Sequence, residues 1–561
     1  PDDRVNSYIK NKILFASTTH FGMSMPFNHP HRQKTALKYA ISAFNIAESS
    51  FKDALEKFIK TIVKNLQEKD YILFLPLINR GISKWEKKFI PDNLLCQITL
   101  PKSVEQLIKL PKEIPYLISK SFNQESIQLE VIISKKYFEP ENYYIYELSR
   151  LEEAHINPVV DSKLKSTNSI LKNQYITLGI GENGNIKSFL YKNQEFSTPN
   201  FLKSSISFGK SKNIIHYFSD KDQVEVLEDG SNNFNASLKI TSNFSILNGL
   251  VVKTEKILKL YAGIPQLFIE VKMSIPEIKG KKNSDSNVYS VKVEYDDRWQ
   301  EIMPCEIRPG FIAGGKSDKE KYLRIWKHNF FGLTTSFDLN MEEVDPLNKN
   351  IDCLVSNISD GWMAVSNQKQ GLLVGFNSIK ASNFAFSPLK IRNEGFGDIN
   401  QSGQQIRINP FGCYYGKMLH HWTTGSGFAQ KMIPSYSSTF KSTAPTFSGK
   451  TLDFDLIIAP FLGDAPDLNI QNAANHYSLP PLVLIHNSKT KKVYNNFENI
   501  QKSIKSIIKS HNIENILDKG YLEWVEMVNE GIEPENKRRD DIDVKISHLI
   551  RLFFDGIRSK F

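Results

Sequence analysis

Between about residue 174 and residue 488 the sequence is a series of short alternating segments separated by turn residues, and this pattern restricts the fold more than any other feature. Runs such as KTEKILKLYA, SVKVEYDD and LDFDLIIAPF alternate polar and apolar side chains, which is typical of strands with one buried face. No strand–helix–strand alternation appears, so a parallel α/β sheet is not expected. We therefore predict a large antiparallel β-sandwich, a supersandwich, over residues 165–490.

The start of this region carries a hairpin signal. The run NQYITLGIGENGNIKSFLYKNQEF places Asn183 and Gly184 between two alternating segments. Because the dipeptide Asn-Gly tolerates positive φ, the run predicts a β-hairpin closed by a type I′ turn. Ile176, Leu178 and Ile180 should then lie on one face of the first strand.

Helical periodicity frames the β-rich region on both sides. Residues 34–67 carry an apolar stripe at a spacing of roughly 3.6 residues, without Pro or Gly, and similar stripes lie beyond residue 491. Between them, YILFLPLINRG, LLCQITLP and IQLEVIIS are typical of the strands of a small β-domain. The predicted fold is mainly β with helical segments. Its parts are an N-terminal helical segment (1–69), a small β-domain (70–151), the large sandwich (165–490) and C-terminal helices (491–561).

Composition argues against several classes of protein. The 71 basic and 61 acidic residues give a net charge of +10, but no Arg-rich stripe with interleaved aromatic residues appears, so nucleic-acid binding is not expected. The four cysteines form no CxxC pair, which excludes a zinc ribbon. No apolar run approaches the roughly 20 residues that span a bilayer. We expect a soluble protein, with the cytoplasm favoured, and the sequence leaves open whether it forms a homo-oligomer.

Three histidines lie together in STTHFGMSMPFNHPHR, directly before the first helical stripe. Imidazole nitrogen is a good zinc ligand, and a loop that enters a long helix could fix its position. From the residues alone, however, His20 is better explained as a partly buried histidine that caps the loop. His29 and His31 flank Pro30 and are expected to be solvated.

Four segments, in order, resemble the C-terminal two-thirds of the α-mannosidases of glycoside hydrolase family 38. The resemblance covers about residues 10–490, and Gly425 stands where the family pattern has Asn after Trp-Thr. The segments are LFLPLINRGISKWEKKFIPDNLLCQITLP, LKNQYITLGIGENGNIKSFLYKNQEF, FGCYYGKMLHHWTTGSGFAQ and DFDLIIAPFLGDAP.

The resemblance implies retaining, zinc-dependent hydrolysis of α-mannosides. The family's N-terminal α/β domain supplies the Asp nucleophile, the acid/base carboxylate and most zinc ligands, and no such domain is found in this sequence. We therefore expect it to be a partner domain or subunit that shares one zinc ion with this chain, which should be inactive alone. His20 occupies the place of the family's last zinc ligand.

No catalytic residue is expected within the chain itself. Asp296 and Asp297 are adjacent, so their side chains should point to opposite faces of a strand and cannot form a carboxylate dyad. An aromatic patch around residues 414–422 suggests contact with the carbohydrate substrate, although its rings could equally fill the sandwich core. The substrate-binding candidates are Tyr415, His421 and Trp422. The alternative function is a non-catalytic carbohydrate-binding or scaffolding β-sandwich protein.

Overall fold

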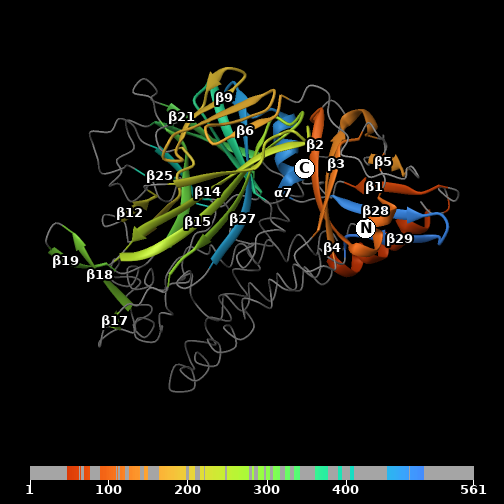
Figure 1. The fold of residues 1–561 in the computed structure, drawn as a ribbon, viewed down its shortest axis with the longest axis horizontal. Coiled ribbons are helices and arrows are strands. Elements are labelled where there is room, and N and C mark those ends of the chain that lie inside the picture. The colour runs from red at the N-terminus through yellow and green to blue at the C-terminus, as the bar shows by residue number, and fades with distance from the viewer. Residues whose placement is uncertain are drawn as a thin grey trace, which may run out of the picture. The chain divides into compact units, whose positions relative to one another are not determined.

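In the computed structural model, the described part of the chain consists mainly of antiparallel sheets (Figure 1). The structure describes residues 47–61, 64, 69–75, 89–108, 110, 114–120, 126–138, 144–148, 163–197, 201–208, 215–219, 222–246, 249–276, 281–282, 289–295, 298–302, 307–315, 322–328, 334–340, 361–376, 390–394, 405–409, 451–478 and 481–497. The strands within these ranges form six sheets, and their pairings are antiparallel. The prediction of a mainly β, antiparallel fold is therefore confirmed.

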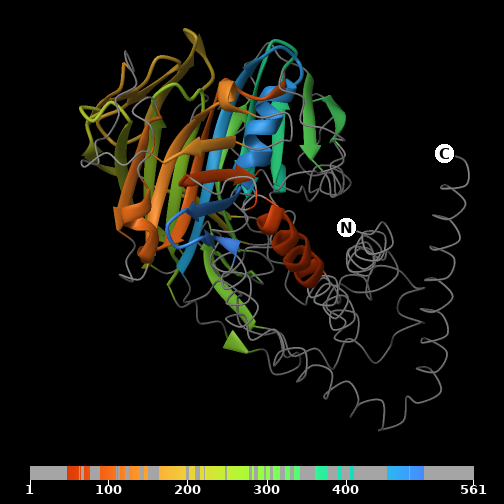
Figure 2. The same ribbon diagram turned by 90° about the vertical axis from the view of Figure 1, so that its right-hand side faces the viewer.

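The largest sheet has nine strands. In spatial order they are β13 (Asp222–Glu228), β14 (Asn235–Ile246), β15 (Leu250–Tyr261), β16 (Leu267–Ser274), β27 (Thr451–Leu462), β24 (Gln370–Phe376), β23 (Trp362–Ser366), β21 (Tyr322–His328) and β22 (Thr334–Asn340). The late strand β27, blue in Figure 2, lies in the middle, between β16 and β24. The sheet is therefore assembled from segments that are far apart in the sequence.

Three further sheets belong to the same β-rich region. One contains β10 (Gln194–Glu195), β9 (Ile186–Tyr191), β8 (Ile176–Ile180), β7 (Ile170–Lys172) and β6 (Lys165–Thr167). The second contains β12 (Ile215–Phe218), β11 (Ser205–Phe208), β20 (Ile307–Gly315), β26 (Gln405–Asn409) and β25 (Lys390–Glu394). The third contains β17 (Lys281–Lys282), β18 (Tyr289–Tyr295) and β19 (Arg298–Ile302).

The main hydrophobic core lies between the nine-stranded sheet and the sheet of β8 and β9. Alternate residues of β14 and β15, such as Leu238 and Leu258, pack with Ile176, Leu178 and Phe189, and all five are almost completely buried. Two sheets that pack face to face in this way form a sandwich, as the alternation in the sequence predicts.

The predicted hairpin is confirmed, but its predicted turn type is wrong. β8 pairs with β9, and Gly184 has φ +74° whereas Asn183 does not have a positive φ. The amide of Gly184 donates to the carbonyl of Gly181 at 2.9 Å, and the pairing register shifts next to the loop. This is a three-residue loop with a glycine bulge, in which only one residue needs positive φ. The paired positive φ angles of a type I′ turn occur instead at residues 192–193, between β9 and β10.

Two smaller sheets involve the first part of the chain. A three-stranded sheet contains β2 (Asn93–Pro101), β4 (Ser126–Ser134) and β3 (Tyr116–Lys120), and a four-stranded sheet contains β29 (Lys492–Asn495), β28 (Leu482–Asn487), β1 (Tyr71–Leu75) and β5 (Tyr144–Glu147). Short 3-10 helices, η2 (Lys102–Leu107) and η3 (Lys135–Tyr137), follow β2 and β4. These sheets share a second core that includes Ile72, Ile98, Leu129 and Ile485.

The four-stranded sheet crosses the predicted domain ranges. β1 lies within 70–151, whereas its partner β28 lies within the range predicted for the sandwich. β29 forms a hairpin with β28 and completes the edge of this sheet. The range predicted for C-terminal helices therefore begins with a strand, whose sequence is KVYN. Residues 498–561 lie outside the described residues.

A third core attaches the three-stranded sheet to the nine-stranded sheet. Leu95 and Ile132 pack with Phe268, Leu373 and Ile457. Helix α7 (Leu468–Ser478) connects β27 to β28 and also belongs to this core, through Ala474 and Tyr477. The nine-stranded sheet is thus covered on both faces around β16, β27 and β24.

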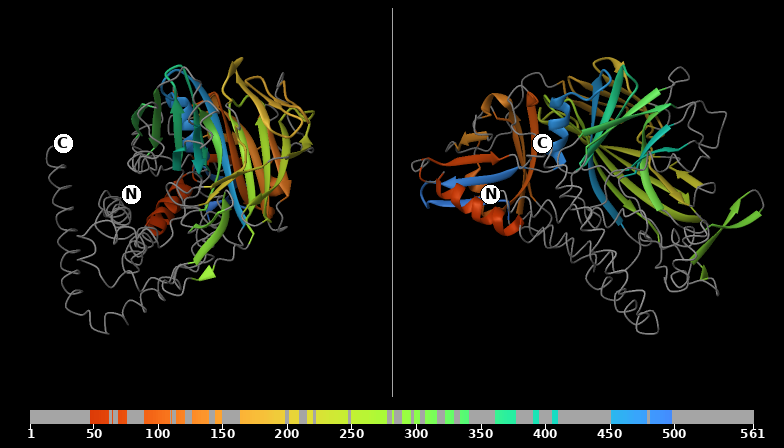
Figure 3. Two further views of the ribbon diagram at one scale, coloured as in Figure 1. Left: turned by 90° about the vertical axis from the view of Figure 1, so that its left-hand side faces the viewer. Right: turned by 180° about the vertical axis from the view of Figure 1, so that it is seen from behind.

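The chain divides into two compact units. One contains residues 59–417 and 435–507, which include all the sheets above, and the other contains residues 1–58, 418–434 and 508–561. Residues 47–61 are helical, red in Figure 3, with Leu55 buried, and they fall within the helical stripe predicted over 34–67. None of the described helices is long and apolar enough to cross a membrane.

Candidate functional site

The site residues predicted from the sequence all lie outside the described residues. They are His20, Tyr415, His421 and Trp422. Within the described ranges, no three His, Cys, Asp or Glu side chains lie close enough to hold a metal ion together. The zinc site and the sugar contacts therefore stay predictions.

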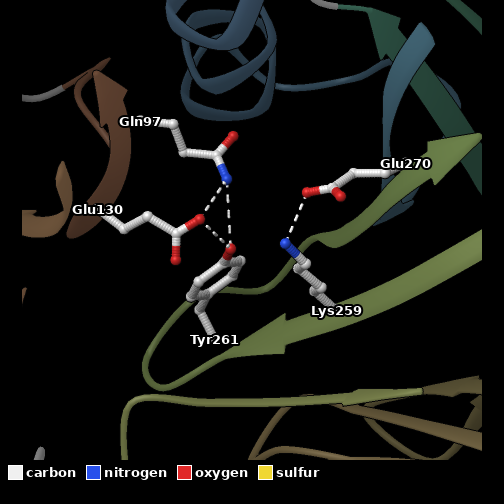
Figure 4. Close-up of polar contacts among 5 residues, drawn as sticks. All are labelled: Gln97, Glu130, Lys259, Tyr261 and Glu270. Carbon is white, nitrogen blue, oxygen red and sulfur yellow. Dashed lines mark hydrogen bonds and ion pairs between the residues drawn. The ribbon is translucent and has the colours of Figure 1, made fainter. Parts of the chain in front are cut away.

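The described residues bring together a different set of polar side chains, at the boundary between the three-stranded and nine-stranded sheets (Figure 4). We call this set the interface cluster. Its members are Gln97, Glu130, Lys259, Tyr261 and Glu270. Gln97 on β2 and Glu130 on β4 are direct cross-strand partners, while the other three come from β15 and β16.

Glu130 and Tyr261 join the two sheets. The Oε1 atom of Glu130 accepts hydrogen bonds from Gln97 Nε2 at 2.9 Å and from the Tyr261 hydroxyl at 3.1 Å. Gln97 Nε2 also lies 3.3 Å from the Tyr261 hydroxyl. Burial, together with the negative charges of Glu130 and Glu270, raises the pKa of Tyr261 well above its usual value. The phenol therefore keeps its proton at neutral pH and donates a hydrogen bond to the Glu130 carboxylate.

The second half of the interface cluster is an ion pair beside a second tyrosine. Lys259 Nζ lies 2.6 Å from Glu270 Oε1, and both side chains are partly exposed. Glu270 on β16 and Asp455 on β27 are register partners, so two carboxylates share one face of the sheet. Burial and the charges of Asp455 and Glu270 raise the pKa of Tyr477 well above its usual value.

Chemically, the interface cluster is suited to binding layers together. Cross-strand carboxylates could in principle have the spacing of a retaining glycosidase, about 5 Å. Glu270, however, is neutralised by Lys259, and Glu130 accepts from Gln97 and Tyr261. Both carboxylates therefore already have polar partners within the fold, and a polar contact joins the two sheets in addition to the third core.

A buried cysteine meets a buried histidine on the face of β2 opposite Gln97, next to the second core. The Sγ of Cys96 lies 3.0 Å from Nε2 of His476 on α7. Burial raises the pKa of Cys96 well above its usual value and lowers the pKa of His476 to about 4. At neutral pH the pair is a thiol beside a neutral imidazole, whereas a nucleophilic cysteine must form a thiolate. The pair is therefore structural.

Sequence reasoning located the strands of the interface cluster but not its members. LLCQITLP and IQLEVIIS are both strands, and their alternation places Gln97 and Glu130 on the faces opposite Ile98 and Leu129. The position of Tyr261 against β2 and β4 depends on contacts between residues more than one hundred positions apart. No local pattern encodes such contacts.

Comparisons with known proteins give structural likenesses only. No family model matches the chain, and no curated protein matches it. The chain is similar to an α-mannosidase from Enterococcus faecalis V583 at 10% identity and a TM-score of 0.42, over 86% of this chain and 57% of that one. A glycosyl hydrolase family 38 protein from Enterococcus faecalis gives 9% identity, a TM-score of 0.42 and coverage of 86% and 58%.

A third likeness is to part of the chain only. A putative aldose 1-epimerase from Escherichia coli K12 gives 9% identity and a TM-score of 0.24, over 53% of this chain and 99% of that one. The chain spans somewhat more than half the length of the two Enterococcus faecalis proteins. None of these likenesses assigns a function.

Proposed function

We propose that this chain is the β-rich C-terminal portion of a retaining, zinc-dependent, α-mannosidase-like glycoside hydrolase. The observation that carries the proposal is the order of the four family-like segments along one chain. Parts of three of them are the described strands β1 and β2, the hairpin of β8 and β9, and β27. The remaining segment, FGCYYGKMLHHWTTGSGFAQ, contains Tyr415, His421 and Trp422.

The proposal divides the chemistry between two polypeptide segments. The N-terminal α/β domain or subunit would supply the nucleophile and the acid/base carboxylate, which in a retaining glycosidase lie roughly 5 Å apart. His20 would complete the zinc site of that partner, and zinc would act there as a Lewis acid toward the sugar hydroxyls. Tyr415, His421 and Trp422 would contact the α-mannoside.

The test is to measure zinc content and turnover of an aryl α-mannoside with this chain alone and in complex with its N-terminal partner. We expect activity and stoichiometric zinc in the complex only, and we expect His20→Ala to abolish both. His29→Ala is the matched control and should change neither. Turnover by the isolated chain would contradict the proposal, because it would require a complete site within these residues.

The alternative is a carbohydrate-binding or scaffolding protein on the same sandwich, for which Gly425 in place of the family's Asn is the motivating observation. Calorimetry with mannosides in the presence of a chelator separates the two. Sugar binding that is indifferent both to the chelator and to His20→Ala, without turnover in the complex, would favour the alternative.

A further inference from the structure

One row of the sandwich core is polar where its neighbours are apolar. Core-facing residues of β14 and β15 are mostly leucine, isoleucine, valine and phenylalanine, but Ser242, Thr254 and Lys256 also face the core and are almost completely buried. Asp222 on β13 pairs with Ser242, and Ser242 pairs with Thr254, so the three lie in one line across three strands. Lys256 is the next residue on the same face of β15.

The segments on either side of β11 and β12 contribute further polar groups. Lys256 Nζ donates to the carbonyl of Leu202 at 2.7 Å. Ser204 follows two residues later, and the amide of Ser219 donates to the Ser204 carbonyl at 3.1 Å. Both serine side chains are fully buried. We call the whole group the interior polar site; its members are Ser204, Ser219, Asp222, Ser242, Thr254 and Lys256.

Most members of the interior polar site have unmet hydrogen-bonding capacity. The hydroxyls of the four Ser and Thr residues, and Oδ1 of Asp222, have no hydrogen-bond partner among the residues that the structure describes. A buried polar atom without a partner carries the full cost of losing water. Five such atoms in one region would consume a large part of the marginal stability of a folded domain. A bound molecule that donates and accepts hydrogen bonds would supply partners to these atoms.

The charges of the site restrict what that molecule is. Asp222 and Lys256 are close enough for the negative charge of Asp222 to oppose the effect of burial, which lowers the pKa of Lys256 to about 8. A cation in the site would face the lysine, and an anion would face the aspartate. An uncharged molecule that both donates and accepts hydrogen bonds satisfies hydroxyls, carboxylate and ammonium together.

We propose that the interior polar site binds a cluster of ordered water molecules that bridge Asp222, Ser242 and Thr254 to Ser204, Ser219 and Lys256. Water is favoured over a larger polyol because every member of the site is at least nine-tenths buried. Buried waters of this kind bind to two to four polar groups each and belong to the fold.

A crystal structure of the full chain at a resolution that defines water is the direct test. We expect ordered solvent within hydrogen-bonding distance of the Ser242 and Thr254 hydroxyls and of Asp222 Oδ1. The proposal is wrong if these hydroxyls bond to each other or to backbone carbonyls with no solvent between them. It is equally wrong if anomalous scattering identifies an ion there, or if the density belongs to an organic molecule.

A pair of variants supplies an independent measurement. Thr254→Val keeps the shape of the side chain but removes one partner of the water, so we expect the midpoint of thermal unfolding to fall by about 2–4 °C. Thr241→Val is the matched control, because Thr241 lies on the outward face of β14 and should change the midpoint little. A midpoint for Thr254→Val that rises, or that equals the control, would show that the hydroxyl was not held by water.

Discussion

Strand β15 carries buried polar groups on both of its faces, and the two faces satisfy them differently. On one face, Tyr261 and Lys259 hydrogen bond to side chains from β2, β4 and β16. On the other face, Thr254 and Lys256 belong to the interior polar site, where protein groups leave five atoms without partners among the described residues. In the interface cluster, side chains distant in sequence provide the hydrogen-bond partners. In the interior polar site, we expect water molecules to provide them.

The two faces of β15 therefore have two different packing roles. A polar network that is fully satisfied by side chains fixes one arrangement of the layers. A network completed by water tolerates small movements, because water can change its position more easily than a side chain can. We therefore expect changes in the interface cluster to destabilise the fold more than changes of similar size in the interior polar site.

The largest effect should come from removing the tyrosine that joins the two sheets. Tyr261→Ala deletes a fully buried ring that packs on Phe234 and Phe268, so it should lower the free energy of unfolding by about 3–5 kcal/mol. Urea denaturation measures the change. Lys253→Ala, at an exposed position on the same strand, is the control. Equal effects of the two substitutions would mean that the third core does not depend on this ring.

Lowering the pH should decrease the free energy of unfolding through His476, which lies on α7. The pKa of His476 is about 4 in the folded chain and about 6.5 when unfolded, so the unfolded chain binds more protons between these values. Stability should be complete above pH 6.5 and decrease by about 3 kcal/mol as the pH falls to 4. Urea denaturation at each pH measures this loss, which His476→Gln should largely abolish. An identical pH dependence in the variant would contradict the assignment.

Raising the pH above 8 should stabilise the fold through Lys256, which lies on the sandwich-core face of β15. Burial lowers the pKa of Lys256 to about 8, below its unfolded value of about 10.5, so the unfolded chain again binds more protons in this window. The free energy of unfolding should rise by about 1–2 kcal/mol between pH 8 and pH 9.5. Lys256→Met should remove the rise. A curve for the native chain that is flat or falls across this range would show that burial does not lower the pKa of Lys256 in the folded chain.

The smallest effect tests the phenol hydroxyl alone. Tyr261→Phe keeps the ring and removes one of two donors to Glu130, so it should lower the free energy of unfolding by about 1 kcal/mol. A double-mutant cycle with Glu130→Gln measures the coupling between the two side chains. A coupling energy near zero would mean that the hydrogen bond does not contribute to joining the sheets.

Periodicity in the sequence predicted the local elements well. Alternation identified the strands of the hairpin and the buried face of Ile176, Leu178 and Ile180, because side-chain burial in a strand repeats every two residues. The turn type was wrong because both loop forms accept an Asn-Gly pair, and only the pairing register distinguishes them.

The sites could not be predicted in the same way. Gln97 and Tyr261 are unremarkable in their own segments and become a cluster only when β2 lies against β15. Asp222, Ser242 and Thr254 are similarly ordinary turn or strand residues until register places them in one row. The histidine of the predicted zinc site, His20, and the proposed sugar contacts lie outside the described residues, so those assignments stay predictions.

The pairing of β1 with β28 has a consequence for the time course of folding in the cell. The ring of His486 lies 3.0 Å from the carbonyl of Lys69, and these residues are 417 positions apart. At roughly 5–20 residues per second, the ribosome needs on the order of 20–80 s to deliver the second strand after the first. During that interval β1 has an unpaired edge, which is a surface to which other chains can add. The four-stranded sheet is therefore completed late in synthesis, because β1 waits for β28.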